Sequence, residues 1–236
     1  MLSLGKLYLI PVPISAHEGL NHLPAFNLSI VQSLTYFISE NAKAARSHLK
    51  LLGYTHLQTA VIEELNQHKK EEQFSDLLTP LLHGFNVGLM SDAGCPGIAD
   101  PGAAIVQLAH QKNIEVIPLS GPSSIVLSIM ASGFNGQNFA FVGYLPIERF
   151  DKVKRLKELE MLAIKHKQAQ FFIETPYRND QLFDIILSTL SPSTLLFIGK
   201  DITGQAQFLK SHSIQQWRSL PKPFMNKVPL VFGIYG

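Results

Sequence analysis

The sequence predicts an α/β fold with two α/β domains of similar length. Short apolar segments alternate with amphipathic segments from end to end, a pattern typical of sheets whose strands are joined by helices. A segment flanked by prolines near residue 120 lies close to the middle of the 236 residues. We therefore expect an N-terminal α/β domain over residues 1–119 and a C-terminal α/β domain over residues 120–236.

The N-terminal half opens with an apolar segment, Lys6–Ile10, which predicts a buried strand that ends at Pro11. Residues 28–39 mix helix formers with β-branched and aromatic residues. We interpret them as a helix that passes into a strand around residues 35–38. Helices are expected at 41–52 and 71–83, because a glycine follows each of them at the place where helices commonly end. The remaining elements predicted in this half are strands at 86–90 and 115–119 and a helix at 103–112.

The C-terminal half repeats the alternation, and residues 149–167 form its longest predicted helix, rich in charged side chains. The other helices predicted here cover residues 123–131 and 179–190, and the predicted strands cover residues 139–144, 169–173, 194–198 and 229–235. Together the two halves predict parallel sheets with helical crossovers.

Composition limits the classes of protein to consider. Apolar residues make up 46% and charged residues 16%, which is typical of a folded globule. The net charge of +2 gives only a weak overall attraction to nucleic acid, so any RNA affinity needs a local basic patch. The single cysteine excludes an intramolecular disulfide and a zinc site made of cysteines, and it suits the cytoplasm. No apolar run is long enough to span a membrane, and Pro11 and Pro13 cut the N-terminal one below signal-peptide length.

The most informative segment is the glycine- and proline-rich run at residues 91–102, SDAGCPGIADPG. It follows a predicted strand and precedes a predicted helix, which is where open α/β sheets bind ligands. Glycines let a ligand approach the backbone, and the helix that begins near Gly102 offers N–H groups to an anion. A rigid turn without a ligand would use the same residue types, so this segment alone leaves both interpretations open.

Several familiar catalytic motifs are absent from the sequence. There is no G-x-G-x-x-G after the first strand and no G-x-x-x-x-G-K-[ST], so nicotinamide and P-loop chemistry lose support. There is no G-x-S-x-G and no H-E-x-x-H, which disfavours a serine hydrolase and a zinc protease. We expect no metal in the site, although Asp92 and Asp100 together could hold a cation. Cys95 could act as a nucleophile, but no partner base is evident.

Three further segments carry polar groups next to predicted elements. Ser120-Gly121-Pro122-Ser123-Ser124 could cap a helix or bind a ligand at the domain boundary. Glu174-Thr175-Pro176-Tyr177-Arg178 follows a strand, and Pro176 prevents further strand pairing there, so its polar groups belong to a loop. The basic residues of the long charged helix are interleaved with acids, which favours a solvated face over phosphate contact; they are Arg149, Lys152, Lys154, Arg155 and Lys157.

Residues 91–102 resemble the S-D-A-G-x-P-x-[IL]-[SA]-D-P-G signature of bacterial small-subunit ribosomal RNA 2′-O-ribose methyltransferases. These enzymes belong to the tetrapyrrole methylase superfamily. Weaker similarities at residues 7–14, 120–124, 143–146 and 174–178 occur in the family's order over nearly the whole chain.

The resemblance implies two α/β domains with S-adenosylmethionine in a cleft between them, usually in a homodimer, and ribosomal RNA or the small ribosomal subunit as partner. It implies a cofactor site lined from the first half by Pro13, Gly94, Cys95, Ile98, Ser123 and Ser124. From the second half, Glu174, Asp201 and Pro229 would approach it. Because a ribose hydroxyl is a weak nucleophile, the reaction also needs a base or a cation, for which the candidates are Glu174 and Lys227.

The chain departs from the family's pattern in four places. Relatives typically have G-N-L at residues 15–17, E-D-T-R at 40–43, R-E-L-T-K at 200–204 and K-G-E-M at 227–230. Here those positions hold SAH, ENAK, KDITG and KVPL. Lys43 and Lys200 stand where relatives have Arg. A lysine cannot make the bidentate contact with a phosphate that an arginine makes. The cofactor loop is kept while the substrate side differs, so the resemblance supports methyl transfer more directly than it supports one acceptor.

Three functions follow from the sequence. The first is methyl transfer from S-adenosylmethionine to a ribose hydroxyl of ribosomal RNA. The second keeps the chemistry with a small tetrapyrrole-like acceptor, which the near-neutral charge permits. The third is a cofactor- or RNA-binding module that has lost catalysis, for which the four departures argue.

Overall fold

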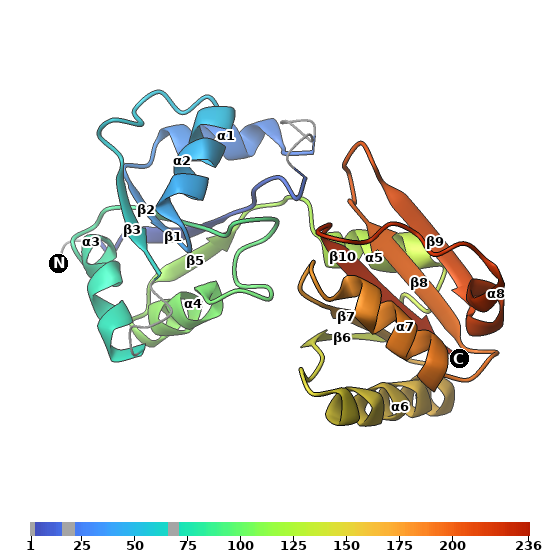
Figure 1. Ribbon diagram of the computed structural model, residues 1–236. Helices are drawn as coiled ribbons and strands as arrows, with labels where there is room; N and C mark the ends of the chain where they lie inside the picture. The colour runs from blue at the N-terminus through green and yellow to red at the C-terminus, as the bar shows by residue number, and fades with distance from the viewer. Residues whose placement is uncertain (1–2, 16–21, 66–70) are drawn as a thin grey trace. The chain divides into compact units, whose positions relative to one another are not determined.

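The computed structural model describes residues 3–15, 22–65 and 71–236, so the sequence departure at residues 16 and 17 lies outside the described residues. The chain divides into two compact units, residues 1–123 and 124–236. Figure 1 shows that each unit is built on its own sheet, with helices against it. The predicted fold class, α/β with two α/β domains, is confirmed.

The first unit contains a parallel sheet with the strand order β3-β2-β4-β1-β5. Each neighbouring pair of strands in it runs parallel. Its strands are β1 (Lys6–Ile10), β2 (Tyr36–Ser39), β3 (Val61–Glu64), β4 (Val87–Met90) and β5 (Glu115–Pro118).

Helices cover both faces of this sheet. They are α1 (Ala25–Gln32), α2 (Ala42–Leu51), the 3-10 helix η1 (Glu71–Leu78), α3 (Thr79–Leu82) and α4 (Gly102–Gln111). Phe37 packs in a core cluster with Val31 of α1 and Leu49 of α2. Its neighbour Ile38 packs in a second cluster with Ile105 of α4. Successive strand residues thus point to opposite cores, as expected for a strand buried on both faces.

The second unit contains a mixed sheet with the order β6-β7-β10-β8-β9. Its strands are β6 (Phe139–Tyr144), β7 (Ala169–Ile173), β8 (Leu195–Lys200), β9 (Phe208–Ser213) and β10 (Leu230–Tyr235). The pair β6–β7 is parallel, whereas β10 runs antiparallel to β7 and β8, and β8 runs antiparallel to β9. The prediction of parallel sheets is therefore wrong for most of this sheet. Only residues 201–207 join β8 to β9, too few for the crossover that a parallel pair requires.

The helices of the second unit are α5 (Ser124–Ser132), α6 (Arg149–His166), α7 (Asn179–Thr189) and α8 (Ile214–Ser219). Leu156 and Leu159 of α6 pack with Leu182 of α7 and with Phe172 and Phe232 of the sheet. This cluster is the main core of the unit, and it fixes α6 and α7 against one face of the sheet (Figure 1).

Two differences from the predicted elements have local causes. Residues 71–83 form a 3-10 helix followed by the short helix α3 instead of one α-helix. Pro80 lacks the N–H that a continuous helix would bond to the preceding turn, and it stands in the first turn of α3 instead. The strands β3 and β9 were not predicted, because Glu63, Glu64 and Lys210 make them look polar. The short helix α8 was not predicted either. None of the helices in the described ranges is long and apolar enough to cross a membrane.

Candidate functional site

The carboxyl ends of the strands of the first unit meet at one edge of its sheet. Ile10 at the end of β1 lies opposite Met90 at the end of β4, and Leu9 lies opposite Pro118 at the end of β5. The segments that follow these strands, residues 11–15, 91–101 and 119–123, therefore leave the sheet side by side. This edge is where ligands bind in open parallel sheets.

Gly94 joins the glycine-rich segment to the chain that follows β1. The N–H of Val12 donates to the carbonyl oxygen of Gly94 at 2.9 Å, and the N–H of Gly94 donates to that of Val12 at 3.2 Å. Gly94 has a φ of +73°, and a Cβ added there would lie 3.1 Å from Cγ2 of Ile14. Both the left-handed backbone and the space therefore favour glycine.

Asp100 binds backbone N–H groups of the same glycine-rich segment. Its carboxylate accepts hydrogen bonds from the N–H of Gly97 at 2.8 and 3.0 Å and from the N–H of Gly102 at 2.7 Å. Burial raises the pKa of Asp100, the two backbone N–H donors lower it, and the charge of Asp92 raises it, with a net rise. The helix that begins near Gly102 was expected to offer N–H groups to an anion, and the N–H of Gly102 itself is already bound by this side chain.

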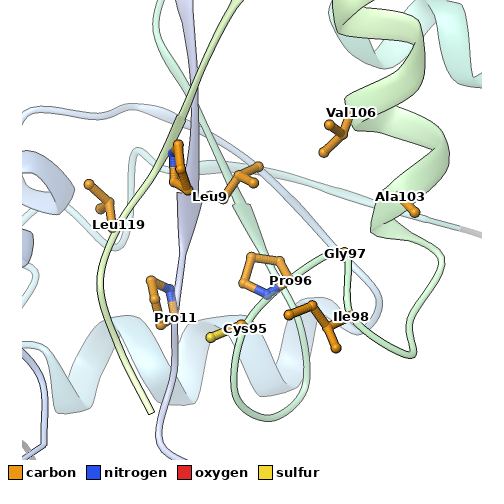
Figure 2. Close-up of a pocket in the computed structure, with 10 residues that line it drawn as sticks. Leu9, Pro11, Cys95, Pro96, Gly97, Ile98, Ala103, Val106 and Leu119 are labelled. Carbon is orange, nitrogen blue, oxygen red and sulfur yellow. The ribbon is translucent and has the colours of Figure 1, made fainter. Parts of the chain in front are cut away.

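A pocket of about 420 Å³ lies between this segment, β1, the end of β5 and α4. Figure 2 shows Pro96 and Ile98 on the glycine-rich segment, Ala103 and Val106 on α4, and Leu9 and Pro11 on the opposite wall. Most of its lining is carbon; the complete set is Leu9, Pro11, Cys95, Pro96, Gly97, Ile98, Ala103, Val106, Pro118 and Leu119. Its volume and apolar walls are those of a small-molecule site.

Cys95 lies on the pocket wall, and its sulfur lies 3.3 Å from the carbonyl oxygen of Pro122. Burial, and after it the charge of Asp100, raises the pKa of this thiol. A thiol with a raised pKa holds less thiolate at neutral pH, which makes Cys95 poorly suited to be a nucleophile. Its place in the wall suits packing against a ligand.

The structure brings some of the residues expected at the cofactor together. Cys95 and Ile98 line the pocket, and Gly94 precedes Cys95. Pro13 follows the bridge between Val12 and Gly94. None of Pro13, Gly94, Ser123 or Ser124 is among the lining residues, and Ser123 and Ser124 stand where the two units divide.

Glu40 is a residue of this edge that the sequence analysis did not propose for the site. It follows β2, and its Oε1 accepts the N–H of Asp92 at 3.3 Å. Burial raises its pKa, the Asp92 N–H lowers it, and the charges of Asp100 and Asp92 raise it, with a net rise. Its neighbour Asn41 caps α2 by accepting the N–H groups of Lys43 and Ala44. The position of Glu40 directly after a strand of the sheet is the feature of the sequence that could have indicated a role in the site.

In the second unit, the residues expected near the site gather at one edge of the mixed sheet. β7 ends where β10 begins, with Ile173 opposite Val231, and β8 ends opposite the same strand, with Lys200 opposite Leu230. The N–H of Asp201 donates to the carbonyl oxygen of Pro229 at 3.3 Å, and that of Lys227 donates to Pro176 at 3.1 Å. Asp201 is therefore joined to Pro229, and Lys227 is joined to the loop that follows Glu174.

Glu174 is buried, and both of its carboxylate oxygens bind cationic side chains. Its Oε2 lies 2.9 Å from Nζ of Lys152, and its Oε1 lies 3.1 Å from the guanidinium of Arg178. Burial would raise its pKa, but the hydrogen bond from Lys152, the Thr175 N–H and the charges of Lys152 and Arg178 together leave it lowered. A carboxylate held in this way accepts a proton poorly, which argues against a general base.

Lys152 corrects the interpretation of the charged helix as a solvated face. Its side chain is 2% exposed and points inward from α6 to Glu174. Lys154 and Lys157 of the same helix are exposed. Lys227 also has an exposed side chain, while the carboxylate of Asp201 accepts the N–H of Ala206 and closes the turn before β9.

Comparisons with known proteins extend the resemblance, although no protein-family model matches the chain. Ribosomal RNA small subunit methyltransferase I of Vibrio cholerae is 28% identical over 197 residues, which are 84% of this chain and 65% of that protein. The protein of the same name from Leptospira biflexa is 28% identical over 84% of this chain and 78% of its own length. That of Halalkalibacterium halodurans is 31% identical over 78% of this chain and 60% of its own length. The chain thus spans 60% to 78% of these relatives.

Solved structures share the fold at low sequence identity. The methyltransferase CobJ aligns with a TM-score of 0.64 at 14% identity, over 98% of this chain and 94% of its own. Uroporphyrin-III-C-methyltransferase of Thermus thermophilus aligns with a TM-score of 0.56 at 15% identity, over 98% and 92%. In sequence, the chain is similar to ribosomal RNA small subunit methyltransferase I proteins, and in fold it is similar to these two methyltransferases.

Proposed function

We propose that the chain is an S-adenosylmethionine-dependent methyltransferase that methylates a ribose 2′-hydroxyl of ribosomal RNA. The observation that carries this proposal is the glycine-rich segment at residues 91–102, which matches the family signature and forms a wall of the pocket in the first unit. The relatives reported above carry the name ribosomal RNA small subunit methyltransferase I.

The pocket suits the nucleoside part of the cofactor. Its walls at Cys95, Pro96 and Ile98 are apolar and fit the face of an adenine ring, and about 420 Å³ lies within the range of small-molecule sites. The methionyl carboxylate has to find donors other than the N–H groups of Gly97 and Gly102, which Asp100 holds. When bound, S-adenosylmethionine supplies a methyl group on a sulfonium leaving group.

The second unit supplies the acceptor side in this proposal. Asp201, Lys227 and Pro229 lie at one edge with the segment that follows Glu174. Lys227 contributes positive charge that favours ionisation of a nearby ribose hydroxyl, and that charge also attracts phosphate. In this proposal Glu174 holds the loop at residues 175–178, and the proton of the ribose hydroxyl goes to solvent or to another group of the RNA. Alignment and exclusion of water are then the protein's main contributions.

The direct test has two steps. Calorimetry with S-adenosylmethionine and S-adenosylhomocysteine, with ATP as control, is expected to show selective micromolar binding, of the order usual for enzyme ligands. A single turnover with methyl-labelled cofactor is then expected to label small ribosomal subunits or naked ribosomal RNA. Digestion to nucleosides locates the methyl group, and a methylated base in place of a ribose would contradict the 2′-O assignment.

A small tetrapyrrole-like molecule is the second candidate acceptor, because the chain has the fold of CobJ and of uroporphyrin-III-C-methyltransferase and a net charge of only +2. Competition between porphyrinoid precursors and RNA for the labelled methyl group discriminates the two. Cofactor binding without turnover on either acceptor would instead favour a module that has lost catalysis.

The assembly and location of the protein belong to the same proposal. We propose a homodimer, as the resemblance to the methyltransferase family implies, and a place in the cytoplasm, which the single cysteine suits. Analytical ultracentrifugation of the purified chain measures its mass, and a species of 26.2 kDa at micromolar concentration would contradict the dimer.

A further inference from the structure

The buried pair of Lys152 and Glu174 occupies a place where the core pattern calls for an apolar residue. Positions 152, 156, 159 and 163 form the inward stripe of α6, and the last three of them are Leu156, Leu159 and Ala163. Lys152 continues this stripe with an ammonium group, and its side chain is 2% exposed. Glu174, which it meets at 2.9 Å, has a side chain that is 1% exposed.

Stability does not account for such a pair. Two buried charges lose their hydration, and apolar residues of similar volume at the same positions are often equally or more stabilising. Glu160 is also buried on α6, but it accepts the N–H of Ser191 at 2.8 Å and so satisfies a backbone donor. The pair of Lys152 and Glu174 instead brings two charged side chains into the core. Its position therefore points to a role at the edge of the sheet, where Glu174 stands.

Glu174 connects Lys152 to the loop that follows β7. Its Oε1 accepts the N–H of Thr175 at 2.8 Å and binds the guanidinium of Arg178 at 3.1 Å. Nε of Arg178 donates to Oγ1 of Thr175 at 2.9 Å. The N–H of Thr175 and the guanidinium of Arg178 are thus bound to one carboxylate, which Lys152 anchors to α6.

The same loop presents groups that suit an RNA acceptor. Tyr177 is 76% exposed, and unstacked bases bind to exposed aromatic rings. The side chain of Arg178 is 33% exposed beside it and can reach a phosphate while it keeps its contact with Glu174. The carbonyl oxygen of Pro176 binds the N–H of Lys227, so the loop also sets the place of that exposed cation.

We propose that Lys152 is a positioning residue, which acts through Glu174 to hold residues 175–178 in the arrangement that binds an unstacked RNA nucleotide. The inference rests on the proposed function for its acceptor. The positioning itself concerns only contacts within the second unit.

The test compares Lys152→Met, Glu174→Met, the double variant and Lys152→Arg. Glu174→Met leaves the buried ammonium of Lys152 without this carboxylate, and Lys152→Met leaves the buried carboxylate of Glu174 with Arg178 but without Lys152. Each single variant is therefore expected to be less stable than the wild type. The double variant is expected to regain the unfolding midpoint of the wild type or exceed it. Its KM for RNA is nevertheless expected to stay raised by about tenfold, with cofactor affinity within about twofold of the wild type. Lys152→Arg keeps the charge and is expected to restore part of the RNA affinity.

The matched control is the double variant Arg155→Met/Glu158→Met, which removes a partly exposed ion pair of 3.2 Å from the same helix. It is expected to leave the KM for RNA unchanged. If Lys152→Met/Glu174→Met recovers both stability and the wild-type KM, the pair is merely structural and the proposal is overturned.

Hydrogen exchange separates this inference from the proposed function. In Lys152→Met/Glu174→Met, the amides of Thr175 and Lys227 are expected to exchange at least about tenfold faster than in the wild type, while amides of β8 and β10 keep their protection. Unchanged exchange at Thr175 and Lys227 would overturn the positioning role. Failure of the wild type to methylate any RNA would instead overturn the proposed function.

Discussion

The carboxylate of Asp100 accepts the backbone N–H of Gly97 with its two oxygens, at 2.8 and 3.0 Å. A third hydrogen bond, from Gly102, ties the same side chain to the first residue of α4. The segment that forms the pocket wall is therefore held in shape by one of its own side chains. A ligand meets a preformed wall, and this lowers the entropic cost of binding.

Asp100→Ala is expected to lower the free energy of unfolding by about 1 kcal/mol, because it removes three hydrogen bonds but also relieves the burial of a charge. It is also expected to weaken cofactor binding, since residues 97–102 lose their internal anchor. Chemical denaturation and calorimetry measure the two effects. Asp92→Ala, at an exposed position of the same segment, is the control for stability. Equal destabilisation by both variants would show that the hydrogen bonds of Asp100 contribute nothing.

Ala103→Trp is expected to fill the pocket of the first unit. Ala103 lines the pocket on the exposed side of α4, so the indole can enter it without disturbing the core. We expect cofactor affinity to fall by about 100-fold, with stability changed by no more than about 0.5 kcal/mol. Gln107→Trp places the same ring one turn further along α4, outside the lining, and should bind the cofactor normally. Wild-type affinity in Ala103→Trp would place the cofactor site elsewhere.

Gly94→Ala is expected to destabilise the first unit by about 1–2 kcal/mol, because an alanine at a φ of +73° is strained. Its Cβ would also press on Ile14, at 3.1 Å. Thermal unfolding measures the loss. Gly136→Ala is the matched control, since a Cβ there meets nothing within 4 Å and the backbone is not left-handed. A midpoint for Gly94→Ala as high as that of Gly136→Ala would contradict the strain.

Glu40→Gln is expected to change how stability depends on pH. The pKa of Glu40 is raised in the folded state, chiefly by burial, so its neutral form is the one that folding favours. Its contribution to stability is complete below the unfolded-state pKa of about 4.3 and is lost as the pH rises through the folded-state pKa. Glutamine keeps an oxygen for the N–H of Asp92 and carries no charge.

The stability of Glu40→Gln relative to the wild type is therefore expected to rise between about pH 4 and pH 7, as measured by urea unfolding at each pH. Glu63→Gln, at an exposed position on β3, is the control and should give no such rise. A difference that falls with pH would reverse the sign that burial gives to this carboxyl.

The strand-and-helix pattern of the first unit could be predicted because its strands are buried on both faces. Residues 7–10 and 87–90 are continuous apolar runs for this reason, and they lie in β1 and β4. The edge strand β3 was missed, since its Val61, Glu63 and Glu64 are exposed and pairing with β2 holds it in place. Local pattern alone carries no signal for a strand of this kind.

The order of the second sheet could not be predicted from the sequence. β10 lies between β7 and β8, although about thirty residues or more separate it from either along the chain. Sequence periodicity states that a segment is a strand but does not state its neighbours or their direction. The antiparallel pairing arises from which apolar faces fit together in the folded unit.

The sequence by itself determined the α/β fold class and the place of the pocket wall, because strand order along the chain and a glycine-rich turn after a strand are both local properties. Only the tertiary structure decided what individual polar groups do. It gave the N–H groups of Gly97 and Gly102 to Asp100, and it turned Lys152 inward to Glu174. Whether a charged side chain is buried or solvated depends on whether folding brings an opposite charge within about 3 Å of it and removes water. Lys152 and Glu174 are 22 positions apart, so the local sequence around either residue does not indicate their contact.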